Sequence, residues 1–260
     1  MNIRQNTSTA IALGFLSVFL PLALGGSLAQ RTVAQSEPHR SDRRVQDQTL
    51  VQVTFEPPGE GEPTDTAGGA SRDEDICGQQ PLESSPCVTP LMPGTQSGLT
   101  VAQRPEFYLY VPETEATELF FALKDANNRH HYQTKIPISG GGGILAVRLP
   151  EEVPALEIGQ TYRWTFILVG KDGLRPDSPG VQGGIERVEL NPNSMGELEV
   201  LTPLEKAALY GAEGIWYDTM STLAQLRRSQ PDDAIVEENW RELLASVGLE
   251  AIAERPLLSP

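Results

Sequence analysis

Histidine and cysteine build most nucleophilic and metal centres in proteins, and this chain holds only three histidines and two cysteines. His39 lies in a polar stretch, while His130 and His131 are neighbours just after a turn signal. Adjacent side chains on a strand point to opposite faces, so these two histidines are not expected to bind one metal ion. The chain has no G-x-S-x-G motif, and neither cysteine has a histidine near it in sequence. The sequence therefore predicts no catalytic residue, no metal site and no cofactor.

Cys77 and Cys87 enclose the short segment GQQPLESSP. In an oxidising compartment the two thiols can form a disulfide, which would add about 2–3 kcal/mol of stability by restricting the unfolded chain. Two free thiols are the alternative, and a zinc site would need ligands that the histidines are not spaced to supply. We expect the disulfide.

Glycine-rich segments and carboxylates are the other candidates for chemistry. The run Gly140–Gly143 leads into the strand-like ILAVRL, whereas a phosphate-binding loop must lead into a helix. In GGASR, successive glycines can turn backbone N–H groups inward and Arg72 adds a positive charge, so Ser71 and Arg72 form a weak candidate site for an anion or a partner. The alternative is a tight loop in which Arg72 pairs with a local acid. The clustered acids at 73–75 would serve glycoside chemistry only as a pair at a defined separation.

The N-terminus has the three-part layout of a secretory signal. Arg4 is followed by an almost purely apolar run from Ile11 to Leu24, and Ser27-Leu28-Ala29 offers small residues to a signal peptidase. The apolar run is about 14 residues long, whereas a membrane span needs roughly 20. We therefore predict a signal peptide over residues 1–29, cleaved near Ala29, and a periplasmic or secreted mature chain with no stable membrane span. A retained anchor is the alternative.

The charge balance limits the classes of partner. The precursor carries 20 Lys+Arg against 35 Asp+Glu, a net charge of −15. Removing residues 1–29 deletes only Arg4, so the mature chain carries −15 − 1 = −16. An acidic chain repels phosphate backbones and anionic membrane surfaces, and no basic stripe offsets that repulsion. Nucleic acid is therefore not an expected partner.

The elements that would position a site begin after a polar linker at residues 30–49. Residues 50–198 show the period-two alternation and turn signals typical of a β domain, with a long loop from Gly59 to Gly98. The expected strands cover residues 50–55, 107–111, 119–123, 132–136, 144–149, 162–168 and 185–187.

The segment LEIGQTYRWTFIL sharpens the fold prediction. Its pattern, Leu156-x-x-Gly159-x-x-Tyr162-x-Trp164, resembles the run into a late strand of immunoglobulin-like and fibronectin-type sandwiches, where a tyrosine hydroxyl bonds back to the backbone. We therefore predict an α+β chain with an Ig-like antiparallel β-sandwich, followed by a C-terminal helical hairpin. A barrel is the alternative to the sandwich.

The helical hairpin is predicted over residues 199–260. Thr202-Pro203-Leu204-Glu205 is a capping box with proline at the first helical position, and apolar residues then recur at threes and fours. Gly211 and Gly214 either divide this segment into two helices or permit a close crossing. A second apolar stripe from Val236 to Val247 predicts the next helix, and a short third helix is expected from Leu249.

Four aromatic residues are the candidates for a partner surface: Tyr108, Tyr110, Trp216 and Trp240. Aromatic anchors dominate many protein interfaces, and helical pairs often hold partner peptides. Alternatively, Trp216 and Trp240 fill the seam between the β domain and the helices.

Several segments together resemble a known family. GGASR at 68–72, GLTVAQRPEFYLYVP, LEIGQTYRW, GIWYD at 214–218 and W-x-x-LL-x-x-VGL at 240–249 are similar to the cyanobacterial domain-of-unknown-function family numbered 928, over roughly residues 50–258. The resemblance implies an exported cyanobacterial protein and carries no established activity. Members often have a cysteine at the end of the strand matching FILVG. Val169 and Gly170 stand there in this chain, so its second cysteine is Cys87 instead.

The sequence thus predicts a non-catalytic protein-binding module of the cell envelope with an unidentified protein partner. A carbohydrate-binding or glycan-processing protein is the alternative, for which we expect exposed Trp or Tyr beside two acids in a shallow cleft. Buried tryptophans would favour the protein-binding module. If the protein is a scaffold without a discrete ligand, we expect neither a cleft nor an apolar patch on its surface.

Overall fold

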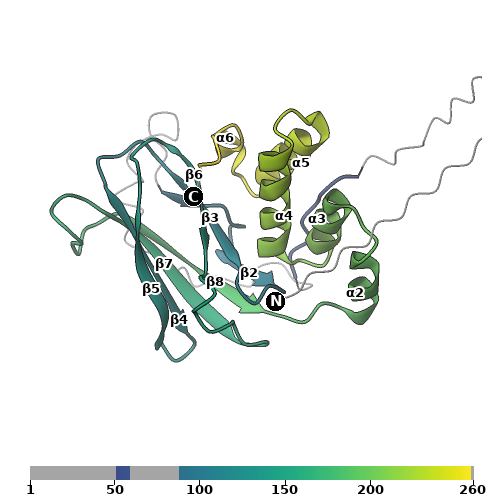
Figure 1. Cartoon of the computed structure of the whole chain (residues 1–260), viewed down its shortest axis with the longest axis horizontal. Coiled ribbons are helices and arrows are strands. Elements are labelled where there is room, and N and C mark those ends of the chain that lie inside the picture. Colours follow the sequence, from purple (N-terminus) through teal and green to yellow (C-terminus); the bar gives the residue numbers. More distant parts are fainter. Residues whose placement is uncertain (1–50, 59–87, 259–260) are drawn as a thin grey trace, which may run out of the picture. The chain divides into compact units, whose positions relative to one another are not determined.

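The computed structural model of the chain defines residues 51–58 and 88–258. Eight strands come first: β1 (Thr89–Pro90), β2 (Ser97–Thr100), β3 (Glu106–Val111), β4 (Glu118–Asp125), β5 (His130–Pro137), β6 (Gly143–Arg148), β7 (Thr161–Val169) and β8 (Gly180–Arg187). The helices follow: α2 (Pro192–Leu198), α3 (Pro203–Ala212), α4 (Trp216–Ser229), α5 (Ala234–Ser246) and α6 (Glu250–Ala253). The described part is therefore α+β, with all strands before the helices (Figure 1).

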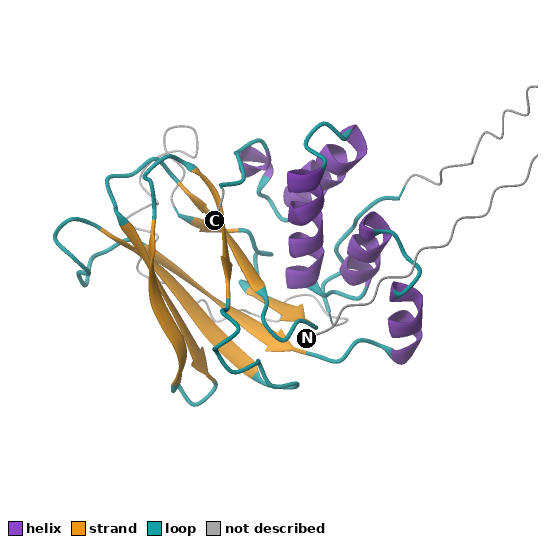
Figure 2. Ribbon diagram, viewed as in Figure 1, coloured by secondary structure: helices purple, strands orange, loops and turns teal. Residues whose placement is uncertain are grey.

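The strands form two mostly antiparallel sheets. One has the order β1-β3-β6, and the other has the order β2-β8-β7-β4-β5. β2 runs parallel to β8, and every other pair of named strands is antiparallel. The helices lie to one side of the strands (Figure 2), where α4 contacts both β2 and β3.

Six strands confirm the alternation read from residues 107–187, and the β-rich prediction holds there. The short strand β1 lies in the region predicted as a long loop, and β2 begins at the end of that region. Ser97-Gly98-Leu99-Thr100 alternates only briefly, so its pairing with β8 could not be read from period alone.

The strand predicted over residues 50–55 is wrong for the part that the structure describes. Residues 51–58 form no strand, and their backbone groups bind helix residues instead. The Val53 N–H donates to Oδ1 of Asn239 at 2.6 Å, and Nδ2 of Asn239 donates to the Val51 carbonyl at 3.2 Å. The Glu56 N–H donates to the Gly211 carbonyl at 3.0 Å. The alternation of apolar side chains that predicted a strand reflects the burial of Val53 in the core, although this segment pairs with no sheet.

The facing surfaces of the two sheets meet through aromatic rings. Phe107 of β3 contacts Phe121 of β4 and Phe166 of β7, with ring centroids 5.2 and 6.2 Å apart. Phe121 and Phe166 stack at 4.6 Å across the β4–β7 pair.

Tyr162 makes the backbone bond that its sequence pattern predicts. The Glu157 N–H donates to the Tyr162 hydroxyl at 3.0 Å, just before β7 begins. The buried Tyr162 ring thus holds the turn that leads into this strand. Gly159 has φ +72° in that turn, a conformation that favours glycine.

The helical region contains more than the predicted hairpin. Thr202 and Glu205 form the expected capping box at the start of α3, and α6 is the expected short helix. Gly214, at φ +71°, separates α3 from α4. Gly211 also permits a close crossing, because a Cβ there would lie 2.0 Å from the Thr54 carbonyl oxygen. Helix α2 was not predicted and falls inside the region assigned to the β domain.

No helix among the residues defined here is long and apolar enough to cross a membrane.

Candidate functional site

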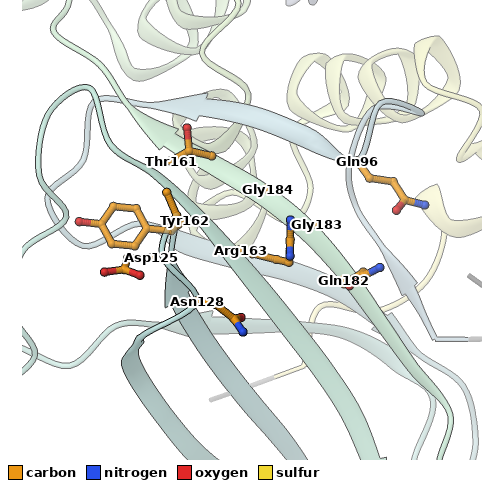
Figure 3. Close-up of a pocket in the computed structure, with 10 residues that line it drawn as sticks. Gln96, Asp125, Asn128, Thr161, Tyr162, Arg163, Gln182, Gly183 and Gly184 are labelled. Carbon is orange, nitrogen blue, oxygen red and sulfur yellow. The ribbon is translucent and has the colours of Figure 1, made fainter. Parts of the chain in front are cut away.

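A polar cleft of about 430 Å³ lies on the outer face of the five-stranded sheet. We name it the outer-sheet cleft. It is formed where the β4–β5 turn, the starts of β7 and β2, and the glycine pair of β8 meet (Figure 3). Its lining residues are Gln96, Asp125, Ala126, Asn128, Thr161, Tyr162, Arg163, Gln182, Gly183 and Gly184.

Gly183 and Gly184 form the floor of the cleft. Trp164 lies directly beneath, since a Cβ on Gly183 would approach its ring to 2.2 Å. Nε1 of Trp164 donates to the Tyr217 hydroxyl at 2.6 Å, and that hydroxyl donates to the Gly184 carbonyl at 2.9 Å. The floor is therefore held from below by two hydrogen bonds that share the Tyr217 hydroxyl of helix α4.

The residues after Gly214 join α4 to the β region. In GIWYD, Trp216, Tyr217 and Asp218 each bond to the β region. Nε1 of Trp216 donates to the Leu91 carbonyl at 2.8 Å. Asp218 accepts from the Thr100 hydroxyl at 2.7 Å and from the Val101 N–H at 3.0 Å. We call these three residues the joint.

Two walls of the cleft have unusual backbone geometry. Gln96 has φ +52° and Asn128 has φ +62°, and these are the only non-glycine residues with positive φ in the described part of the chain. Asparagine adopts this conformation readily in turns, whereas glutamine does so at a cost. Gln96 is held there because the Gly184 N–H donates to its carbonyl at 2.8 Å. The strain places the Gln96 side chain at the rim of the cleft.

Four polar side chains of this cleft make no hydrogen bond or ion pair with any described residue: Gln96, Asn128, Arg163 and Gln182. All four are exposed. Gln96 and Gln182 stand on one side of Arg163, and Asn128 stands on the other (Figure 3). The cleft therefore presents amide groups and one guanidinium that the fold itself does not use.

A comparison with protein families identifies the family of this chain. The family model described as Domain of Unknown Function (DUF928) matches residues 67–257, which is most of the chain. The chain belongs to this family. No curated protein matches it.

In this DUF928 chain the four predicted partner-surface residues are buried, with exposed fractions of 5% for Tyr108, 4% for Tyr110 and 0% for Trp216 and Trp240. The prediction that they form a binding surface is therefore corrected, because each ring is used inside the fold. The Tyr108 hydroxyl donates to Glu106 at 2.6 Å, and Nε1 of Trp240 donates to the Ala253 carbonyl at 2.9 Å. Arg255 covers the Tyr110 ring, and Trp216 belongs to the joint. The alternative, that Trp216 and Trp240 fill a seam, agrees with their burial.

Ser71, Arg72, Cys77 and Cys87 lie outside the described residues. The weak anion site and the disulfide therefore remain predictions. His130 is exposed, whereas Nε2 of His131 lies 2.9 Å from the Pro154 carbonyl oxygen. Over residues 51–58 and 88–258, no three His, Cys, Asp or Glu side chains gather closely enough to hold a metal ion.

A second cleft of about 300 Å³, the helix-side cleft, lies between β3, β6 and α4. Four of its five charged groups, Arg104, Glu106, Arg148 and Asp218, are bonded within the fold, whereas the Glu151 carboxylate has no partner among the described residues. The Arg104 guanidinium donates to the carbonyls of Pro150, Glu151 and Val153, and Arg148 is paired with Glu106. Burial raises the pKa of the Asp218 carboxyl above its ordinary value of 3.8, against the opposing effect of its hydrogen bonds.

Sequence reasoning missed all four functional candidates: Gln96, Asn128, Arg163 and Gln182. Each is a common surface residue at an unremarked position on or beside a strand. The one local signal was the pair Gly183-Gly184 inside a strand pattern, which marks a close approach of other groups.

Proposed function

We propose that this DUF928 protein is an exported cell-envelope protein and a non-catalytic protein-binding module, and that it binds its partner at the outer-sheet cleft. One observation carries the proposal: Gln96, Asn128, Arg163 and Gln182 converge there without partners among the described residues. Polar groups that a fold leaves unused at one concave site are available to bind another molecule. The side-chain amides donate and accept hydrogen bonds, and the guanidinium only donates them. Neither group changes its protonation near neutral pH, which favours binding over proton-transfer chemistry.

The burial of aromatic side chains favours a protein partner over a glycan. All three tryptophans are at most 2% exposed. Tyr162, the one aromatic residue that lines the outer-sheet cleft, is also buried. The cleft contains a single acid, Asp125, and its carboxylate is bound by the Asn127 and Arg129 N–H groups and by the Arg129 side chain. A sugar-stacking ring and a free acid pair are therefore both missing from this cleft.

The relation to immunoglobulin-like domains is also our proposal. Two features support it: the Tyr162 hydroxyl bond at the entry to β7, and the strand orders β1-β3-β6 and β2-β8-β7-β4-β5. The latter sheet corresponds to the strand set in which an immunoglobulin variable domain places its C, F and G strands side by side. The stacked Phe121 and Phe166, with Phe107, would take the place of the disulfide that joins the sheets of antibody domains.

Export to the periplasm or beyond rests on the secretory signal in residues 1–29. Expression of the full chain in a cyanobacterial cell, the host that the family resemblance implies, tests it. Intact-mass measurement on the envelope fraction should give a chain that begins near Gln30. A chain that retains Met1 in the membrane fraction would contradict cleavage.

Site-specific photocrosslinking tests the binding site. A photoreactive amino acid replaces Gln182 in the tagged full-length precursor, and cells are irradiated before affinity purification, with peptidoglycan and polysaccharide fractions assayed alongside. The matched control carries the same group in place of Gln225, which lines the helix-side cleft. We expect one abundant protein adduct from position 182 that is lost from position 225. Equal adducts at both positions, or retention on polysaccharide without a protein adduct, would overturn the proposal.

A further inference from the structure

Arg163 differs from the other arginines of the described residues. Nine others each have a partner: Arg104, Arg129, Arg148, Arg175, Arg187, Arg227, Arg228, Arg241 and Arg255. Arg163 has none among residues 51–58 and 88–258. The chain has 35 acidic and 20 basic residues, so acids to pair with are plentiful. An arginine left unpaired in such a chain is available to an external anion.

The strand register places a second cation beside it. Lys124 of β4 is directly opposite Arg163 of β7, on the outer face, and it too has no ion pair among the described residues. Like charges directly opposite on neighbouring strands repel and destabilise the sheet. An anion bound between the two side chains would remove that repulsion.

The same register opens space next to the guanidinium. On its other side Arg163 pairs with Gly184 of β8, and Gly184 pairs with Ser97 of β2. The row across the sheet is therefore Lys124, Arg163, Gly184 and Ser97. The third position has no side chain, and the Ser97 Oγ lies beside it, 2.9 Å from where a Cβ on Gly184 would be. A ligand can lie over Gly184 with one end on Arg163 and with Gln96 and Gln182 beside it (Figure 3).

The neighbouring acids do not compete for Arg163. The Asp125 carboxylate is occupied by its own turn, and the Arg129 N–H that donates to it is the first cause of its lowered pKa. Glu186 accepts from the Thr161 hydroxyl at 3.4 Å. Both acids carry charge near the cleft, which disfavours ligands of high negative charge and leaves room for a single carboxylate.

We infer that the outer-sheet cleft binds a carboxylate-bearing extended peptide segment. The guanidinium of Arg163 contacts the carboxylate in its forked geometry, with Lys124 adding charge. The side-chain amides of Gln96 and Gln182 bind main-chain N–H and C=O groups of the peptide. This inference rests on the proposed function, since it names the chemistry of the partner's bound segment.

The test is an NMR titration of the mature chain with N-acetylated tetrapeptides, followed by the amide resonances of the protein. The probes are acetyl-Gly-Asn-Asp-Gly-amide, its isostere acetyl-Gly-Asn-Asn-Gly-amide, and acetyl-Gly-Asn-Asn-Gly with a free C-terminal carboxylate. Inorganic phosphate is the anion control. We expect a carboxylate peptide to shift the resonances of Gly183, Gly184 and the side-chain amides of Gln96 and Gln182. Its affinity should be at least tenfold higher than that of the isostere. Whether the side-chain or the terminal carboxylate binds better identifies its source in the partner.

Matched variants separate the inference from general charge effects. Arg163→Gln should lower the affinity for the tighter-binding carboxylate peptide about tenfold, and Lys124→Gln should lower it less. Thermal melting should show that both variants are folded. Arg175→Gln, an exposed arginine paired with Asp177 away from the cleft, should leave the affinity unchanged. The affinity should also fall as salt is raised, because the site is exposed.

Three outcomes would overturn the inference: equal binding of acid peptide and isostere, equal weakening by Arg175→Gln, or phosphate binding as tightly as the peptides. Photocrosslinking at position 182 distinguishes what has failed. If position 182 gives an adduct but the titration shows no selectivity for a carboxylate, the cleft is still the binding site and the proposed ligand class is rejected. Loss of the adduct rejects the proposed function itself.

Discussion

Tyr217 lies between two clefts that are built from similar residues and differ in what those residues bind. In the helix-side cleft, Asp218 and Arg104 are used by the fold, the first by the Thr100 hydroxyl and the second by three backbone carbonyls. In the outer-sheet cleft, Arg163 and the two glutamines have no partner among the described residues. Charge and concavity alone therefore do not identify a binding site. What distinguishes the two is their arginines, because Arg104 and Arg148 are bonded within the fold and Arg163 is not.

The comparison predicts its largest effect at the joint. Trp216→Ala removes a fully buried ring that also donates to the Leu91 carbonyl and contacts Phe55 edge-on. We expect a loss of about 3–5 kcal/mol in the free energy of unfolding, measured by urea denaturation. Leu174→Ala is the control, because Leu174 is 49% exposed and should cost little. A loss below about 1 kcal/mol for Trp216→Ala would mean that the joint does not hold the sheets and helices together.

A smaller loss is expected from the hydroxyl beneath the cleft. Tyr217→Phe leaves the buried Nε1 of Trp164 without its acceptor and removes the Tyr217 hydroxyl as a donor to the Gly184 carbonyl. Each unsatisfied buried group costs about 1–3 kcal/mol, so we expect a destabilisation of that order. Tyr132→Phe is the matched control, since the half-buried Tyr132 donates no hydrogen bond to any described residue. Equal effects of the two variants would show that the hydrogen-bond chain does not support the floor.

The sequence predicted the elements better than the site, and the residues show why. Strand alternation and the capping box at Thr202 are local, so six strands and the start of α3 could be read directly. The turn at Tyr162 could be predicted because its bond spans only five residues. The outer-sheet cleft depends on the register that sets Arg163 beside Gly184 and Lys124, and register between distant strands is not written in any one segment.

The aromatic residues show the opposite failure. Tyr108 and Trp216 were prominent in sequence because large rings anchor interfaces, but large rings are equally the residues that fill a core. Only the contacts of Trp216 with Leu91 and Phe55 decide between the two uses. The predicted strand at residues 50–55 failed for a similar reason, because Asn239 binds the backbone groups that a neighbouring strand would bind.

The pH dependence of stability should separate the buried acid from the exposed charges. Burial raises the pKa of Asp218 in the folded state above its ordinary value of 3.8. The folded state therefore favours the protonated carboxyl, so this contribution is fully present below pH 3.8 and is lost as the pH rises through the folded pKa. Asp218→Asn removes the titration. The advantage of the wild type over this variant should shrink as the pH rises above about 4, in urea denaturation at several pH values.

Asp177→Asn is the control for that measurement, because Asp177 forms an exposed ion pair with Arg175 and should give a nearly flat difference. An advantage of the wild type that grows with pH would instead mean that the hydrogen bonds from Thr100 and Val101 outweigh burial at Asp218.

The smallest change in the free energy of unfolding is expected for a substitution in the outer-sheet cleft. Arg163→Gln breaks no bond to a described residue and relieves repulsion with Lys124, so the free energy of unfolding should change by less than about 0.5 kcal/mol. Arg104→Gln in the helix-side cleft removes donors to three carbonyls and should cost about 1–3 kcal/mol. Both proteins are compared by urea denaturation under one set of conditions. If Arg163→Gln were as costly as Arg104→Gln, Arg163 would be held by the fold after all. The distinction between bonded and unbonded arginines would then no longer separate the two clefts.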